Sequence, residues 1–171
     1  MQRPGLLVAG LTASGAALAK GLFMGYPKKS FESGFLLAKE QAIVAAFADT
    51  LFPPGGPIPL SGTQAGVVAY FDKYDARLPA QQGVLIRLLL WFVEHGPWVF
   101  GPRPTRFTSL SERDRLRVME AMRTSPIYFR RIAFLSMRTM LTMGYLANPE
   151  VARAMRMKAD PDPFSKKEVC A

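Results

Sequence analysis

The side chains that most often do chemistry in proteins are scarce here: His95 is the only histidine and Cys170 the only cysteine. Most zinc sites and most Ser-His or Cys-His catalytic devices need more groups than these two residues supply. Glu94 and His95 form the one acid–histidine neighbour pair, but adjacent helical residues point about 100° apart and do not chelate an ion together. We expect His95 to pair with the terminal carbonyls of a helix that ends before Gly96.

Sequence motifs with a known chemical mechanism are absent as well. The chain contains no G-x-G-x-x-G, no G-x-x-x-x-G-K-[ST], no G-x-S-x-G, no H-E-x-x-H and no C-x-x-C-H sequence. Most of the nine methionines fall where a helical core uses flexible filler, not where copper or haem would need them. We therefore expect no catalytic residue, no metal site and no cofactor in this chain.

The net charge of +9 is concentrated in the C-terminal part of the chain. Residues 101–171 hold fourteen Lys/Arg and seven Asp/Glu, so +7 of the charge lies there. Such a bias suits an anionic membrane, an acidic protein partner or nucleic acid, and a solvated basic face fits it too. Acidic residues are interspersed among the arginines and no aromatic stripe accompanies them, so we expect no nucleic-acid partner. Nucleic-acid binding ranks third among the hypotheses for this chain.

Residues 1–34 begin with an uncharged run from Pro4 to Ala19. The length of this run and the triplet at residues 17–19, Ala-Leu-Ala, suit an export signal. An uncleaved helix that associates with a membrane or packs on a partner also fits, as does a tail with neither role, although Lys20 interrupts a full membrane span. The residues assigned to such a membrane or partner helix are Leu6, Leu7, Val8, Leu11 and Leu18.

Hydrophobic spacing in the body of the chain predicts helices only. Apolar residues recur at helical intervals within residues 35–52, 63–77, 80–95, 109–122, 126–146 and 149–157. Residues 80–95 are apolar almost all round, with Arg87 and Glu94 on one narrow polar edge, which is typical of a central buried helix. Ser109 and Glu112 have the spacing of a capping box.

The fold class predicted from these segments is all-α. Single helices of this length joined by short connections favour one compact helical domain of about five to six helices over residues 35–157, with an extended tail at 158–171. The side chains expected to face inward are Leu36, Ile43, Phe47, Leu51, Val67, Val68, Phe71, Tyr74, Leu116, Met119, Met122, Phe129, Ile132, Met140 and Met143.

One loop, "DTLFPPGGPIPLSG" at residues 49–62, holds four prolines and three glycines. Prolines fix the backbone where the preceding helix stops, and glycines allow turns that other residues resist. Neither Asp49 nor Ser61 has a histidine or lysine partner in view. The loop is therefore predicted to be a rigid corner between two helices rather than a linker or a catalytic loop.

Four stretches of the body carry a more specific pattern. They are "LFPPGGPIPLSGTQAGVVAYFD" (51–72), "LIRLLLWFVE" (85–94), "RFTSLSERDRLRVMEAMRTSPIYFRR" (106–131) and "FLSMRTMLTMGYLANPEV" (134–151). In this order they resemble the gluconate 2-dehydrogenase subunit 3 family, whose features include a Leu-[Ile/Phe]-Pro-Pro helix end and a Tyr-[Phe/Leu]-x-[Asn/Ser]-Pro turn. The resemblance covers roughly residues 38–155.

The resemblance implies a small, non-catalytic subunit of an oxidoreductase complex. The large partner of such subunits belongs to the glucose-methanol-choline type and carries the FAD, a cytochrome subunit can complete the complex, and the small subunit supports folding, stability and export. Members usually begin with a twin-arginine signal, whereas this chain has Gln2-Arg3. The expected location is therefore the cell envelope or a membrane, with the periplasmic and the cytoplasmic side both open.

A subunit of this kind works through its surface rather than through a catalytic group. Aromatic residues and arginines dominate binding hot spots, so the Gly/Pro-rich turns that carry them are the expected contact regions. The candidate partner interface consists of Pro57, Ile58, Pro59, Trp98, Phe100, Arg106, Phe107, Arg130, Arg131 and Tyr145. The alternative function is that of a monotopic membrane-surface protein held by its N-terminal helix and its basic C-terminal third.

Overall fold

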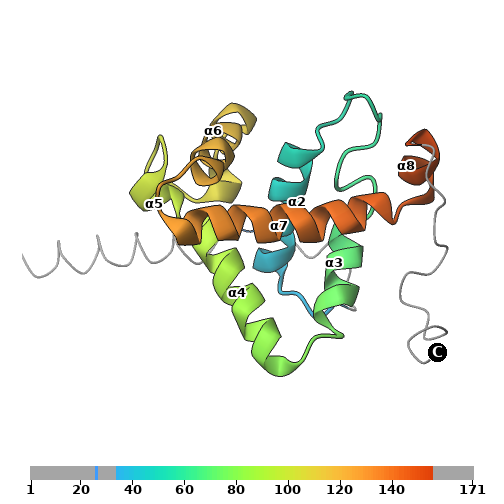
Figure 1. The fold of residues 1–171 in the computed structure, drawn as a ribbon, viewed down its shortest axis with the longest axis horizontal. Helices are drawn as coiled ribbons and strands as arrows, with labels where there is room; N and C mark the ends of the chain where they lie inside the picture. Colours follow the sequence, from blue (N-terminus) through green and yellow to red (C-terminus); the bar gives the residue numbers. More distant parts are fainter. Residues whose placement is uncertain (1–25, 27–33, 156–171) are drawn as a thin grey trace, which may run out of the picture.

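Helices account for all regular structure in the part of the chain that the computed structural model describes, which is Tyr26 and residues 34–155 (Figure 1). The helices are α2 (Ala38–Leu51), α3 (Val67–Asp75), α4 (Ala80–His95), α5 (Pro97–Phe100), the 3-10 turn η1 (Phe107–Ser109), α6 (Glu112–Arg123), α7 (Tyr128–Leu146) and α8 (Pro149–Ala154). The predicted all-α class is confirmed.

Carboxylates set the beginning of α2. The backbone N–H of Leu36 donates to Asp72 Oδ1 (2.7 Å), and the N–H of Leu37 donates to Glu40 Oε2 (2.8 Å). Both amides are therefore satisfied outside the helix, and Leu37 is the extended N-cap residue. As a result α2 begins at Ala38, three residues later than the apolar pattern predicts.

The N-cap of α6 differs from the predicted capping box. Ser111, not Ser109, precedes the helix, and its Oγ accepts from the backbone N–H of Asp114 (3.3 Å). Ser109 instead ends the 3-10 turn η1. The prediction chose the wrong serine because both serines have an acidic residue three positions later, Glu112 and Asp114 respectively.

The hydrophobic core lies where α2 and α7 meet the other helices. In the view of Figure 1, α7 runs across the molecule, α2 passes behind it, α3 and α4 lie below and α6 lies above. Helix α2 contacts α3, α4, α6 and η1, while α7 contacts α3, α6 and α8. At the centre the ring of Phe47 lies 5.7 Å from that of Phe107 and 6.3 Å from that of Phe134, measured between centroids.

The Gly/Pro-rich loop after α2 forms the predicted corner. Asp49 in α2 accepts hydrogen bonds from the backbone N–H of Thr63 (2.8 Å) and from its hydroxyl (2.9 Å), which closes the loop at its base. At Gly62 the returning chain lies against α2 so closely that a Cβ would approach the carbonyl carbon of Ala48 to 2.6 Å. Only glycine fits this approach.

The corner is also held by the far end of α7. The hydroxyl of Tyr145 donates to the carbonyl of Leu60 (2.7 Å), and its ring stacks on Phe52 with centroids 3.9 Å apart. The side-chain amide of Asn148, the N-cap of α8, donates to the carbonyl of Ala65 (3.1 Å). The two stretches 51–72 and 134–151 therefore pack as one structural unit.

Several predicted inward faces are corrected by the structure. Leu116 in α6 is 50% exposed, and in α7 Phe129 is 77%, Ile132 38% and Met143 41% exposed. These four side chains lie on surfaces that the chain leaves open. The other predicted inward residues are buried or half-buried: Leu36, Ile43, Phe47, Leu51, Val67, Val68, Phe71, Tyr74, Met119, Met122 and Met140.

Candidate functional site

An apolar groove opens between α4 and α7. It has a volume of about 720 Å³. Tyr74, Gln82 and Ser136 are its polar lining residues. The other lining residues are Leu78, Leu85, Ile86, Leu88, Leu89, Phe92, Phe129, Ile132, Ala133 and Met140.

Several side chains on both walls of this groove are exposed to solvent. On α4, Leu85 is 64% and Leu88 58% exposed, and Phe129 stands across from them on α7. Single exposed apolar residues are normal on a soluble protein, but a contiguous set of this size usually marks a place where another molecule binds. The groove is therefore the candidate functional site.

Helix α4 divides its apolar residues between two sides. Ile86, Leu90 and Val93 are buried against the core, whereas Leu85 and Leu88 are exposed. The principal contacts of α4 are with α2, α5 and η1, so the side that faces α7 stays open. The prediction of a central buried helix at residues 80–95 is wrong, because that pattern does not distinguish burial in the core from burial against another molecule.

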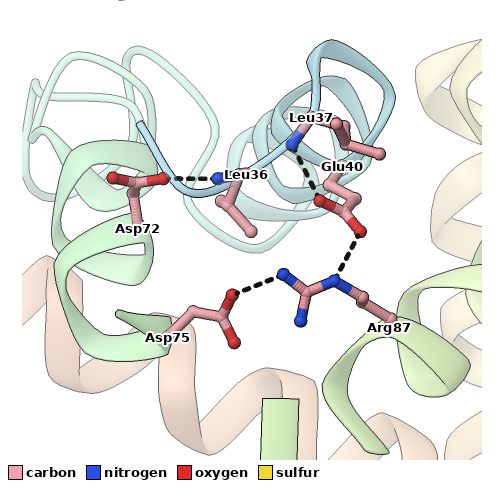
Figure 2. A network of polar contacts seen from close by, with 6 residues as sticks. All are labelled: Leu36, Leu37, Glu40, Asp72, Asp75 and Arg87. Atoms are coloured by element: carbon pink, nitrogen blue, oxygen red, sulfur yellow. Dashed lines mark hydrogen bonds and ion pairs between the residues drawn. The ribbon is translucent and has the colours of Figure 1, made fainter. Parts of the chain in front are cut away.

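The N-terminal half of α4 is fixed by a polar network that Figure 2 shows. The Nε of Arg87 lies 3.6 Å from Glu40 Oε1 in α2, and its Nη2 lies 3.4 Å from Asp75 Oδ2 at the end of α3. Arg87 of α4 thus contacts both α2 and α3. Glu40 and Asp72 also accept hydrogen bonds from the backbone ahead of α2. The network therefore ties α4 to α2 and α3.

The carboxylates of this network are buried, whereas the side chain of Arg87 is 43% exposed. Burial raises the pKa of Asp75, the nearby carboxylate of Asp72 raises it further, and Arg87 opposes the rise. A buried carboxylate of this kind needs its cationic partner, since an unpaired buried charge is costly. The network therefore has a structural role, and no group of three His, Cys, Asp or Glu within residues 34–155 or Tyr26 could hold a metal ion.

The other end of α4 is fixed by Glu94, which is fully buried. Its carboxylate accepts hydrogen bonds from the hydroxyl of Tyr26 (2.8 Å), from the backbone N–H of Thr108 (3.1 Å) and from the Thr108 hydroxyl (2.7 Å). Burial and the bond to Glu94 raise the pKa of Tyr26 to about 12, so the phenol stays protonated and donates. Tyr26 is thereby attached to the helical body.

His95, the last residue of α4, contacts a lysine instead of helix carbonyls. Its Nε2 lies 3.2 Å from the Nζ of Lys39, and its ring lies 5.2 Å from that of Trp91. Burial lowers the pKa of His95, and the charge of Lys39 lowers it further, so the neutral ring accepts from the ammonium group. The predicted pairing with terminal carbonyls is wrong.

The predicted interface residues fall into separate groups rather than one surface. Pro57 and Pro59 are exposed and Ile58 half-buried at the corner, far in sequence from Trp98 and Phe100, which are 40% and 42% exposed on α5. Neither of the two cavities described here is lined by both the corner residues and the α5 residues. Each stays a prediction about a separate surface.

Two of the predicted interface residues are not available to a partner. Phe107 is 0% and Tyr145 5% exposed, because both rings pack in the core. Arg106 is half-buried, with its guanidinium 4.6 Å from the centroid of the Tyr26 ring. The assignments of Phe107 and Tyr145 to a contact surface are therefore corrected.

Arg130 and Arg131 lie at the start of α7, close to α5. The guanidinium of Arg130 stands 4.5 Å above the ring of Phe100, and Arg131 donates to the carbonyls of Ser125 (2.7 Å) and Pro126 (3.0 Å). Both arginines thus stabilise the turn that begins α7. Their outer surfaces remain part of the α5–α7 end of the molecule.

The groove residues themselves were missed as a site. Leu85, Leu88 and Phe129 are apolar residues within predicted helices, and apolar residues at helical spacing predict a face that packs in the core. One feature of the sequence does indicate the groove: α4 has apolar residues on more sides than contact with one core can bury. The predicted membrane or partner helix, Leu6, Leu7, Val8, Leu11 and Leu18, lies outside the described residues.

Within the described residues, one stretch is long and apolar enough by length and composition to cross a membrane. It is Ala80–Phe100, 21 residues that include α4 and α5. Of its apolar 18-residue segment, 33% is buried inside the structure. The core helix of a soluble protein can have the same length and composition, so this observation is weak evidence for a membrane span.

Comparison of the chain with protein families, curated proteins and solved structures gives no match.

Proposed function

We propose that this chain is the non-catalytic small subunit of an oxidoreductase complex. In this proposal it binds and stabilises a large FAD-dependent alcohol or sugar dehydrogenase of the glucose-methanol-choline type, and helps to export it or to hold it at the membrane. The FAD belongs to the partner, and a cytochrome subunit is a further member of the complex. The observation that carries the proposal is the open apolar groove between α4 and α7.

The exposure of the groove favours a protein partner over a small ligand. Ligand pockets enclose most of the molecule they bind, whereas Leu85 and Phe129 are 64% and 77% exposed. Protein interfaces combine an apolar centre with aromatic anchors and a polar rim. The groove offers Phe92 and Phe129 as aromatic anchors, with Gln82 among its polar lining residues.

The corner supports the proposal in a different way. The motif stretches on which the family resemblance rests meet each other through Tyr145, Asn148 and the carbonyls of Leu60 and Ala65. These contacts give the motif residues a role in building the scaffold. The groove is a separate surface, so a subunit of this kind would use its motifs to fold and its groove to bind.

Native purification of the full chain from its own cells under mild conditions tests this proposal. We expect a larger protein to accompany it and to show the visible absorbance of a bound flavin. The flavin should leave with the larger protein when the two are separated, because the cofactor belongs to that partner. A colourless chain that purifies alone and stays monomeric would overturn the proposal.

A further inference from the structure

A second exposed surface lies at the end of the molecule formed by α5 and the start of α7. We call it the aromatic tip, defined by Trp98, Val99, Phe100 and Tyr128. Val99 is 75% and Tyr128 61% exposed, and Trp98 and Phe100 are 40% and 42% exposed. Figure 1 shows α5 beside the beginning of α7, on the left of the molecule.

The aromatic tip is a fixed arrangement rather than two loose turns. Phe100 and Arg130 line one small cavity together with Pro97, and the guanidinium of Arg130 lies 4.5 Å from the centroid of the Phe100 ring. On the other side, Arg131 lies 5.8 Å from the centroid of the Tyr128 ring. Cation–π contacts therefore hold arginines against the aromatic side chains.

Basic residues outnumber acidic ones around these apolar side chains. The two segments that form this end of the molecule, residues 97–106 and 125–131, contain four arginines and no Asp or Glu. Arg103 has 73% of its side chain exposed, and its Nε lies 3.8 Å from Asp114 of the neighbouring helix α6. The surroundings of the tip are therefore electropositive, and complementary to an anionic surface.

We propose that the aromatic tip docks on the surface of a bilayer that contains anionic phospholipid. Trp and Tyr prefer the boundary between headgroups and acyl chains, and nearby basic residues gain from anionic headgroups. The cavity beside the tip holds only about 10 Å³, too little for an anchor side chain of a protein partner. A fluid lipid surface needs no preformed pocket.

This docking site has its own exposed residues, although it borders the groove where the ring of Tyr128 lies 6.0 Å from that of Phe129. The groove is lined by Leu85, Leu88 and Phe92, whereas the tip uses Trp98 and Val99 on the following turns. Failure of one proposal would therefore leave the other standing.

The first test is sedimentation of the full chain with vesicles of phosphatidylcholine alone or with phosphatidylglycerol added. Val99→Asp places a negative charge at the tip, and Val84→Asp is its matched control, since Val84 is another valine on the same helical stretch and is 56% exposed. We expect Val99→Asp to lower the partition onto anionic vesicles about tenfold and Val84→Asp to change it less than about twofold.

The outcomes of sedimentation each decide the proposal. Stronger binding to anionic than to neutral vesicles, lost selectively in Val99→Asp, supports it. Equal binding to both vesicle types, or equal effects of the two variants, overturns it, because another segment would then hold the chain on lipid. Unchanged thermal unfolding of both variants serves as the control for folding.

The second test uses tryptophan fluorescence, because the chain has only Trp91 and Trp98. Trp91→Phe leaves Trp98 as the sole reporter at the tip, and Trp98→Phe leaves Trp91, two turns back on α4, as the matched reporter. Anionic vesicles should shift the emission of Trp98 to shorter wavelength more than that of Trp91. An unchanged Trp98 spectrum, or a larger shift at Trp91, would overturn the proposal.

Discussion

Helices α2 and α4 have similar apolar sequences and different surroundings. Eight of the 14 residues of α2 are buried, but only five of the 16 residues of α4 are. Helix α2 is surrounded by α3, α4, α6 and η1, whereas α4 meets the core on one side and leaves Leu85, Leu88 and Trp91 exposed. Apolar composition thus reports that a helix has surface to bury, not which molecule buries it.

The comparison also separates stability from function. Residues that face the core lower the free energy of the folded chain, and their replacement should be felt in the chain alone. Residues that face the groove should contribute little to the stability of the isolated chain, because their apolar surface is in water there. Four substitutions or titrations, in order of decreasing expected effect, test this distinction.

Truncation of Phe47 in α2 should have the largest effect. The side chain is fully buried between Phe107 and Phe134, so Phe47→Ala should lower the free energy of unfolding by about 3–5 kcal/mol. Urea denaturation measures the change, and Phe35→Ala, at a 65% exposed phenylalanine, is the control. Similar losses in the two variants would show that α2 is not the centre of the core.

The core side of α4 should come next. Leu90 is 1% exposed, and Leu90→Ala should lower the free energy of unfolding by about 2–5 kcal/mol. Leu89, half-buried at the groove, should give a smaller loss in the same denaturation experiment. If Leu90→Ala costs less than about 1 kcal/mol, α4 is not anchored to the core in the way described.

The burial of His95 at the end of α4, together with the nearby charge of Lys39 in α2, should make the stability of the chain depend on pH. Folding lowers the pKa of His95 below 6.5, so the unfolded chain binds a proton more readily than the folded chain does. Stability should therefore decrease as the pH falls through 6.5. Melting temperatures at several pH values should show a weaker decrease for His95→Gln; identical profiles would remove His95 as the cause.

The groove side of α4 should show the smallest effect on the isolated chain. Leu85 is 64% exposed, so Leu85→Ala should change the free energy of unfolding by less than about 0.5 kcal/mol. Chemical denaturation alongside Leu90→Ala provides the direct contrast between the two sides of one helix. A loss as large as that of Leu90→Ala would mean that the groove wall belongs to the core.

Much of the helical scaffold follows from local sequence signals. Residues 80–95 were predicted with the bounds that α4 has, because Pro79 and the Gly96-Pro97 pair mark both ends. The start of α2 was less accurate, because it depends on Asp72 of another helix. Bonds between residues distant in sequence leave no local pattern.

The candidate site was not predictable in the same way. Leu85 and Leu90 are the same residue type in the same helix, but Leu90 is on the side that meets the core and Leu85 is on the side that lines the groove. Glu94 illustrates the converse: its burial depends on Tyr26 and Thr108, which are 68 and 14 positions away. The side of a helix that stays open is a property of packing between helices.

The central claim, that the groove binds a flavin-carrying partner, is tested most directly by recovery of that partner. Phe129→Ser removes an exposed phenylalanine of the groove, and Phe35→Ser removes one elsewhere that is exposed to a similar extent, 65% against 77%. With both variants purified from the same cells, the account predicts that Phe129→Ser loses most of the accompanying flavin absorbance while Phe35→Ser keeps it. Equal recovery with the two variants would contradict the account.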